Sequence, residues 1–487
     1  MQVCLIYPHW TGEYGKISYF ANKVSSFPPL NLANLAAVAE LYGHKCQIID
    51  AQIENRTEDD LVAELTACPP DLVGLSATSP FFHFSARLAK KLKLAIPSLT
   101  TVIGGHHVTI MGDKAFDAAF DYALLGEADH TFPELLNALE NAGEVTQVKG
   151  LLLRRNGETI FTGTAAPVTD LDSLPVPARH LLKTEQYLMG TLEGTKRYTT
   201  IATSRGCPFK CIFCSTEIFG HHLRKRNPEN VIREIRAVQE RFGIDHFYFL
   251  DETMTIDREH FRRICELIIS ENIKITFEGS TRANLVDEDI IRIMRKAGLL
   301  RISFGLESVD EQIRRTMRKE IPLDAYLQAN RLTNKYGIET LNSCMIGLPG
   351  ENVETICKTL RFLRSSKEIR QANVSIAVPY PGTELYRMAK AGEMGLKLVT
   401  EDFSEYRRYN AAVMQVGNLS TDNLIRLQND AIASVSLAPW RWRPIVKRSG
   451  YYGLWLTFGR VLQSLKNGMI NIFSNSPKQG KLYGKIT

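Results

Sequence analysis

The sequence predicts an α/β protein with an N-terminal Rossmann-like domain, a partial (β/α)6 barrel and a mainly helical C-terminal region. Short apolar runs alternate with helical segments along residues 1–145 and again along 196–400. Strands that alternate with helices form parallel sheets covered by helices. A hairpin and a proline-rich linker separate the two runs at 146–195, and the composition changes again at 401–487.

The composition is that of a globular protein. At about 150 residues per domain, 487 residues correspond to three domains. The N-terminus has no basic segment ahead of an apolar run, and no stretch is apolar enough to span a bilayer. Nine cysteines without a secretory signal favour a reducing compartment, so we expect a cytoplasmic protein.

The pattern of the first domain predicts a parallel sheet. We expect strands at 3–7, 46–49, 72–76, 101–103 and 122–125, and helices at 32–42, 59–67 and 85–94. Such sheets bind ligands beyond the carboxyl ends of their strands. The loops there contain neither Gly-x-Gly-x-x-Gly nor Gly-Lys-Ser/Thr, so no nucleotide phosphate site is predicted.

The segment that follows connects the domains. Residues 151–161 read as a hairpin, with Asn156-Gly157 at its turn. Three prolines, Pro167, Pro175 and Pro177, then predict an extended linker.

The second domain repeats the strand–helix pattern. We expect strands at 198–203, 246–252, 275–278, 301–308, 340–347 and 374–379, and helices at 228–242, 258–270, 287–297, 323–336 and 353–363. Six successive βα units imply a partly closed parallel barrel with its active site at the carboxyl ends of the strands.

Three cysteines lie close together after the first barrel strand. Cys207, Cys211 and Cys214 follow residues 198–203, and Gly206 and Pro208 prevent a regular helix there. Converging thiolates suit zinc or an iron–sulfur cluster. Zinc is the weaker interpretation, because the adjacent pair His221-His222 lacks the spacing of a zinc finger. Three ligands on a four-iron cluster leave one iron open.

The Cys-x3-Cys-x2-Cys spacing, with Phe213 before the last cysteine, resembles the signature of radical S-adenosylmethionine (SAM) enzymes. The resemblance implies a [4Fe–4S] cluster on Cys207, Cys211 and Cys214, with SAM on the fourth iron. Reductive cleavage of SAM then yields a 5′-deoxyadenosyl radical, and a flavodoxin- or ferredoxin-type protein supplies the electron.

The resemblance extends to the ends of the other barrel strands. It places Phe213 and seven further residues around SAM: Asp251, Glu252, Arg282, Glu307, Ser308, Gly347 and Pro379. Taken singly, each carboxylate is more typical of a solvated strand end or a helix cap, and only their shared position relative to the three cysteines favours SAM binding.

The first domain resembles the cobalamin-binding domain that precedes many radical SAM cores. Ser76-x-Thr78 and Gly104-Gly105 match two parts of the cobalamin pattern. The third part, Asp-x-His-x-x-Gly, is absent, so the resemblance implies cobalamin without that lower histidine ligand. We expect His9, His106 and His107 on the ligand side. The alternative is a Rossmann-like domain that packs on the core or binds substrate.

The C-terminal region is basic. From Arg441 to Thr487 it has nine basic and no acidic residues, which exceeds the formal charge of +6 of the whole chain. Aromatic residues are interleaved with these charges. Such a segment can lie on an anionic membrane surface or dock on the protein itself. Nucleic-acid binding is not expected, because the charge is confined to this segment.

Together these features predict a cobalamin-dependent radical SAM enzyme. The favoured reaction is C-methylation at an unactivated carbon of a lipid, a tetrapyrrole or a secondary metabolite. The alternatives are a cobalamin-dependent oxidative cyclase or rearrangement enzyme, an RNA methylthiotransferase, and a non-catalytic iron–sulfur or corrinoid carrier. The first domain lacks the cysteine motifs typical of methylthiotransferases.

Overall fold

The computed structural model describes residues 1–10, 27–191, 193–436, 438–442 and 446. The chain divides into two compact units. The first comprises Met1–Met189, Arg197–Pro208 and Ser215–Tyr248, and the second comprises Gly190–Lys196, Phe209–Cys214 and the chain from Phe249 onward. Among the described residues, we find no helix that is both long and apolar enough to cross a bilayer.

The first unit contains a seven-stranded sheet with the order β2-β1-β3-β4-β5-β6-β7. Its first five strands pair in parallel, as predicted. In chain order they are β1 (Gln2–Tyr7), β2 (Lys45–Asp50), β3 (Leu72–Ser76), β4 (Thr100–Gly104) and β5 (Tyr122–Leu124).

The predicted hairpin forms β6 (Leu151–Arg155) and β7 (Glu158–Phe161). Asn156 and Gly157 have φ angles of 54° and 83°, as a type I′ turn requires. Strand β6 pairs antiparallel with β5, so the hairpin extends the first sheet and makes it mixed.

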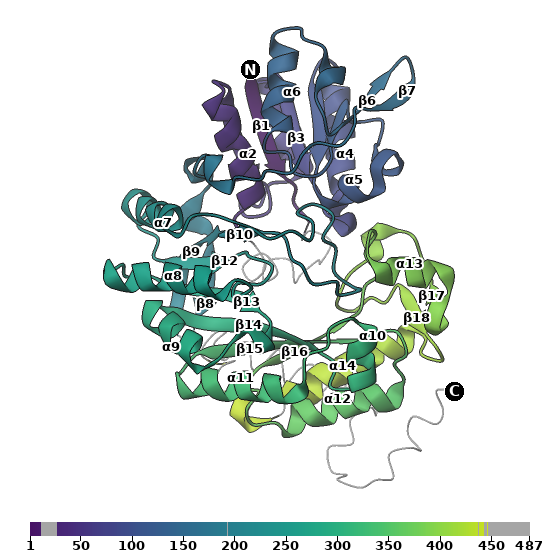
Figure 1. Cartoon of the computed structure of the whole chain (residues 1–487). Helices are drawn as coiled ribbons and strands as arrows, with labels where there is room; N and C mark the ends of the chain where they lie inside the picture. The colour runs from purple at the N-terminus through teal and green to yellow at the C-terminus, as the bar shows by residue number, and fades with distance from the viewer. Residues whose placement is uncertain (11–26, 192, 437, 443–445, 447–487) are drawn as a thin grey trace. The chain divides into compact units, whose positions relative to one another are not determined.

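Helices cover both faces of the first sheet (Figure 1). They are α2 (Leu30–Leu41), α3 (Glu58–Ala67), α4 (Phe82–Ala95), α5 (His106–Met111) and α6 (Thr131–Glu140). One hydrophobic core contains residues of α3, α4 and α5, and another contains residues of α2 and α6. The Ala- and Leu-rich composition of α2 suits this burial, since its small side chains let the helix approach the sheet closely.

A second seven-stranded sheet has the order β16-β15-β14-β13-β12-β9-β8. Its last four strands in the chain pair successively in parallel. The strands are β8 (Leu188–Thr191), β9 (Gly194–Ile201), β12 (His246–Phe249), β13 (Thr276–Thr281), β14 (Leu299–Glu307), β15 (Glu339–Ile346) and β16 (Ala372–Ile376). This open sheet agrees with the predicted partial barrel.

The barrel helices follow the predicted rhythm. They are α7 (Pro228–Phe242), α8 (Arg258–Ser270), α9 (Glu288–Ala297), α10 (Glu311–Thr316), α11 (Leu323–Lys335) and α12 (Val353–Ser365). In the second unit, α8, α9, α11 and α12 succeed one another along one side of the sheet (Figure 1). Phe249, Phe261 and Phe277 meet edge to face between α8 and the strands.

The C-terminal region continues the second unit. It contains α13 (Glu384–Ala391), the two-stranded sheet β17 (Leu396–Leu398) with β18 (Met414–Val416), and α14 (Thr421–Ser436). The Gln428 side chain on α14 donates to the carbonyl oxygen of Val374 on β16 at 3.2 Å. Most of the basic segment, expected either on a membrane surface or docked on the protein itself, lies outside the described residues.

Arg441 belongs to the protein interior rather than to a basic surface. Its side chain is buried and donates to the carbonyl oxygens of Val435, Ile369 and Leu363. Burial lowers the pKa of Arg441 to about 10. This residue therefore docks the end of the described chain on its own core, the second of the two fates considered for the segment.

Candidate active site

The loop that carries the three cysteines is closed by a two-stranded ribbon. Strands β10 (Ser204–Arg205) and β11 (Arg224–Lys225) pair antiparallel on either side of the loop. Gly206 has a φ angle of 94°, and a Cβ atom there would overlap the carbonyl oxygen of His222. Glycine is therefore required where the chain leaves the ribbon.

Cys207 is buried at the start of this loop. Its backbone N–H donates to the carbonyl oxygen of Gly220 at 3.2 Å, and its own carbonyl oxygen lies 3.0 Å from Nδ1 of His221. The His221 ring thus contacts the backbone at the start of the loop.

Cys211 and Cys214 belong to the second unit. The backbone N–H of Cys214 donates to the carbonyl oxygen of Cys211 at 3.1 Å, forming a tight turn. Nη1 of Arg282 lies 3.6 Å from Sγ of Cys211, and its guanidinium stacks 3.7 Å from the centre of the Phe209 ring. Arg282 therefore places a positive charge beside a sulfur that would carry negative charge as a cluster ligand.

The donor set fits an iron–sulfur cluster by its chemistry. The structure describes all nine cysteines and joins none of them in a disulfide, and three of them occur within one short loop. Within the described ranges, no three His, Cys, Asp or Glu side chains are gathered as they are around a bound metal. The assignment of the three cysteines thus stays a prediction.

Glu307 stands at the carboxyl end of β14 in an unusual conformation. Its φ angle of 61° is left-handed, a strained conformation that concentrates at functional sites. The buried carboxylate accepts from Nζ of Lys319 at 2.7 Å. Nζ of Lys319 also lies 5.7 Å from the centre of the Phe213 ring. Lys319 therefore joins two residues that were predicted to surround SAM.

Sequence reasoning missed Lys319. It lies in a run of charged residues, Arg318-Lys319-Glu320, which resembles a solvated surface. Only the burial of its side chain, 9% exposed, distinguishes it, because buried lysines are rare unless paired.

The glycine turn after β15 is held by its own glutamate. The buried carboxylate of Glu351 accepts from the backbone N–H groups of Gly347 and Leu348 at 2.8 and 3.0 Å. Burial raises the pKa of Glu351 to about 8, although both hydrogen bonds oppose the change. Leu424 of α14 packs against Gly347, whose φ angle is 84°.

The other predicted SAM contacts differ in exposure. Asp251 and Pro379 are buried beyond the ends of β12 and β16, whereas Glu252 is exposed. Ser308 is fully buried, with Oγ 3.3 Å from Oγ1 of Thr359 on α12 and accepting from the Asp310 N–H. It stabilises the start of α10 rather than presenting an open hydroxyl.

The four predicted cobalamin contacts lie together at the ends of β3 and β4. Ser76 pairs with Gly104, and Asn31 donates to its hydroxyl at 3.1 Å. Gly105 has a φ angle of 100°, and a Cβ atom there would lie 2.8 Å from the carbonyl oxygen of Ala77. At Gly104 the nearest atom would be 3.8 Å away, so Gly104 is the cleaner position for a probe substitution. Thr78 directly precedes the short helix at 79–81.

Of the three loop histidines, His107 is a core residue. It is buried, its Nδ1 lies 3.1 Å from the Ser79 hydroxyl, and its ring packs 4.5 Å from that of Phe82. Burial lowers its pKa to about 4, so the ring is neutral. His9 is half-buried and His106 is exposed.

Trp10 was not singled out from the sequence. Its backbone N–H donates to Oε1 of Gln52 at 3.0 Å, and its ring stacks 4.7 Å from that of Phe81. It connects the loops after β1, β2 and β3 at the edge where a ligand is expected.

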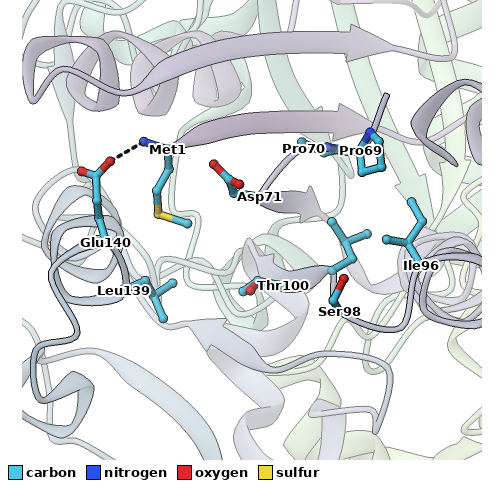
Figure 2. A pocket seen from close by; sticks show the side chains of 10 residues that line it. Met1, Pro69, Pro70, Asp71, Ile96, Ser98, Thr100, Leu139 and Glu140 are labelled. Carbon is cyan, nitrogen blue, oxygen red and sulfur yellow. Dashed lines mark hydrogen bonds and ion pairs between the residues drawn. The ribbon is translucent and has the colours of Figure 1, made fainter. Parts of the chain in front are cut away.

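A separate pocket lies at the opposite edge of the first sheet, at the amino ends of β1, β3 and β4 (Figure 2). It has a volume of about 630 Å³, and its lining includes Asp71, Thr100 and Glu140. The N-terminal ammonium of Met1 binds Glu140 at 2.6 Å beside it. This pocket contains none of the predicted cofactor contacts.

Two family models match the chain. A B12 binding domain matches residues 19–136, and a radical SAM superfamily domain matches residues 201–363. The chain is 30% identical to an uncharacterized methyltransferase of Pyrococcus horikoshii, over 85% of this chain and 88% of the relative. It is 28% identical to the anaerobic magnesium-protoporphyrin IX monomethyl ester cyclase of Rubrivivax gelatinosus, over 83% of this chain and 72% of that protein.

The fold is also found in a solved structure. The radical SAM methyltransferase TsrM of Kitasatospora setae, with cobalamin and a [4Fe–4S] cluster bound, superposes with a TM-score of 0.70 at 15% identity, over 93% of this chain and 99% of that one. Fold and matched domains define a two-module enzyme that combines a corrinoid domain with a radical SAM core. The chain belongs to the B12-binding radical SAM family, whose cofactors are a [4Fe–4S] cluster, SAM and cobalamin.

Proposed function

We propose that this enzyme is a methyltransferase that transfers a methyl group to an unactivated carbon of a small molecule or lipid. Two observations together carry the proposal. The chain contains both a B12 binding domain and a radical SAM domain, and along 85% of its length it is similar to a relative named as a methyltransferase. The substrate proposed is a tetrapyrrole, a lipid or a secondary metabolite, and the nature of the cyclase relative favours the tetrapyrrole.

The residues of the chain would bind and orient the cofactors. When bound, the cluster with SAM supplies a hydrogen-abstracting radical and the corrinoid supplies a methyl carrier. Cys207, Cys211 and Cys214 would hold the cluster, with Arg282 balancing the charge at Cys211. Gly104 and Gly105 expose backbone to a flat ligand.

Polar groups of the barrel would bind SAM. Lys319 holds Glu307 in place, and Glu351 fixes the turn at Gly347. Asp251 and Glu252 follow the carboxyl end of β12, just as Glu307 stands at the carboxyl end of β14. Burial around Asp251, Glu307 and Glu351 excludes water and strengthens their electrostatic interactions.

An oxidative cyclase is the second candidate. The match to the magnesium-protoporphyrin ester cyclase favours it, although it spans less of that relative than the match to the methyltransferase does. Product mass separates the two reactions, because methyl transfer adds a labelled methyl group from SAM and cyclisation does not.

The compartment, the electron donor and the membrane contact are also proposals. We place the enzyme in the cytoplasm with a flavodoxin- or ferredoxin-type electron donor, and the basic C-terminal segment offers a peripheral membrane contact. Nucleic acid is not proposed as a partner.

The first test is the cofactor content after anaerobic purification. We expect iron and sulfide near four per chain, stoichiometric cobalt on adding cobalamin, and both 5′-deoxyadenosine and S-adenosylhomocysteine on reduction with SAM. Formation of 5′-deoxyadenosine without S-adenosylhomocysteine or transferred methyl label would contradict methyl transfer and support the cyclase. Absence of both products would support the alternative of a non-catalytic iron–sulfur or corrinoid carrier.

The cluster assignment is tested by Cys211→Ala. Loss of one thiolate should abolish the iron–sulfur absorbance and SAM cleavage while cobalamin binding persists, because the corrinoid domain does not use this residue. The matched control is Cys68→Ala, at an exposed cysteine outside the loop. A full cluster in Cys211→Ala contradicts the assignment.

A further inference from the structure

Two arginines face each other at the base of the loop at 206–223, which contains the three cysteines and is called the cluster loop below. Arg205 of β10 pairs with Arg224 of β11, and the loop that contains Cys207 runs between them. Whatever fixes these two side chains also fixes both ends of the loop.

Both arginines bind carboxylates of the loop after β5. Nη1 of Arg205 lies 2.8 Å from Oε2 of Glu127 and 2.8 Å from Oδ2 of Asp129, and its Nη2 lies 3.0 Å from Oδ1 of Asp129. Nη2 of Arg224 lies 2.5 Å from Oε1 of Glu127. Arg205 thus makes a bidentate contact with Asp129, the geometry that fixes orientation best.

The four charges are enclosed and balanced. The side chains of Arg205, Arg224, Glu127 and Asp129 are 11%, 6%, 2% and 7% exposed. Arg224 also donates to the carbonyl oxygens of Val168 and Phe219, and the Arg205 guanidinium lies 5.2 Å from the Phe219 ring. Removing one partner of a buried ion pair leaves the other charge unpaired and is costly, so we expect these four groups to favour one arrangement.

The carboxylates stand at the predicted cobalamin edge. Strand β5 pairs with β4, and a Cβ atom at Gly104 would lie 3.8 Å from Cβ of Leu124 at the end of β5. Glu127 and Asp129 lie three and five residues after Leu124 and belong to the stretch matched by the B12 binding model. A ligand that orders this loop therefore acts on groups that bind the base of the cluster loop.

We propose that Arg205, Arg224, Glu127 and Asp129 form a positioning network that couples cobalamin binding to the cluster loop. The inference rests on the proposed use of both cofactors. None of the four side chains is assigned a chemical step; they act by holding the loop that carries Cys207.

The test is thermodynamic linkage in the full-length protein. The dissociation constant of hydroxocobalamin is measured by absorbance titration with the cluster loaded and after its removal by a chelator. Coupled sites typically change each other's affinity by about 5- to 150-fold, so we expect at least a fivefold ratio in the wild type. Asp129→Asn removes the bidentate carboxylate and should bring the ratio close to one, while the cluster-free affinity stays within about twofold of wild type.

Two further variants make the result decisive. Arg205→Lys retains the charge without the planar fork and should also lower the ratio. Arg87→Gln removes an ion pair with Glu58 on the surface of the same domain and should keep the wild-type ratio.

A wild-type ratio of one, or an undiminished ratio in Asp129→Asn, overturns the coupling. Loss of both cofactors in both network variants would mean a purely structural role and overturn it as well. A wild type that binds no cobalamin contradicts the proposed function instead.

Discussion

At the scale of single residues, the candidate site depends on buried charges and on glycines with left-handed backbone. Glu307 combines a buried charge with a left-handed backbone at a residue other than glycine, and its ion pair with Lys319 stabilises this conformation. Glu351 differs because it has no cationic partner among the described residues. Its carboxyl group is buried against two backbone N–H groups, and burial raises its pKa to about 8.

Glu351 should make stability depend on pH. Since the pKa in the folded protein lies above the ordinary value of 4.5, the folded state retains a proton that the unfolded chain loses between pH 4.5 and 8. The group's contribution is therefore fully present below pH 4.5 and is lost as the pH rises toward 8, at up to about 1.4 kcal/mol per pH unit.

Glu351→Gln should remove this dependence, because the amide keeps the shape and cannot ionise. The free energy of unfolding, measured by urea denaturation from pH 5.5 to 8, should fall more steeply with pH in the wild type than in the variant. The control is Glu354→Gln, at an exposed position in the first turn of α12. Parallel pH profiles for wild type and Glu351→Gln would show that the Glu351 carboxyl is already ionised.

At the scale of elements, helices with clear end signals were predictable from the sequence. Helix α7 has the predicted bounds because Asn227 accepts from the Glu229 N–H at its start and Gly243 ends it in left-handed conformation. Helix α5 was not predicted, since it has six residues and no side-chain cap. The edge position of the hairpin was likewise unpredictable, because its turn residues determine the turn but not the strand it joins.

The parts of the site that the sequence did not predict are contacts between distant residues. The three cysteines and the glycine turns follow local spacing rules, so the sequence alone was enough to propose them. The ion pairs of Arg205 with Glu127 and Asp129 join residues 78 and 76 positions apart. The charge pattern at either end resembles an ordinary surface, so only the fold shows that these groups are buried together.

Arg441 should determine the stability of the C-terminal elements. It donates to Leu363 in the last turn of α12, to Val435 in the last turn of α14, and to Ile369. Arg441→Met leaves these carbonyl groups without that donor, which should cost about 3 kcal/mol. Urea denaturation gives the loss, and hydrogen exchange should be faster in α14.

Arg441→Lys should recover only part of this stability, because one ammonium group reaches fewer carbonyl oxygens than a guanidinium does. The control is Arg364→Gln, at an exposed position on α12. Wild-type stability in Arg441→Met would mean that water replaces the buried hydrogen bonds.

At the scale of the whole molecule, positive charge is distributed unevenly. The nine basic residues from Arg441 to Thr487 exceed the formal charge of +6, so the rest of the chain is net acidic. Arg441 is buried against carbonyl groups, and the other eight basic residues of the segment, in 443–487, lie outside the described residues. Both proposed functions accommodate a membrane contact, since lipids and tetrapyrroles are poorly soluble in water.

Anionic vesicles should therefore bind the full-length protein through this segment. Basic residues near an anionic surface contribute about 1 kcal/mol each, so replacing Lys447, Arg448, Arg460 and Lys466 with glutamine should weaken binding roughly a hundredfold or more at low salt. Co-sedimentation with phosphatidylserine-containing vesicles measures this. The difference should shrink at 0.5 M salt, where charges are screened, and vesicles of phosphatidylcholine alone should bind weakly.

A matched variant with Lys114, Lys296, Lys367 and Arg370 replaced, all exposed outside the segment, should bind as the wild type does. Equal weakening in both variants would mean that binding follows total charge, and the membrane contact proposed for the segment would then be wrong.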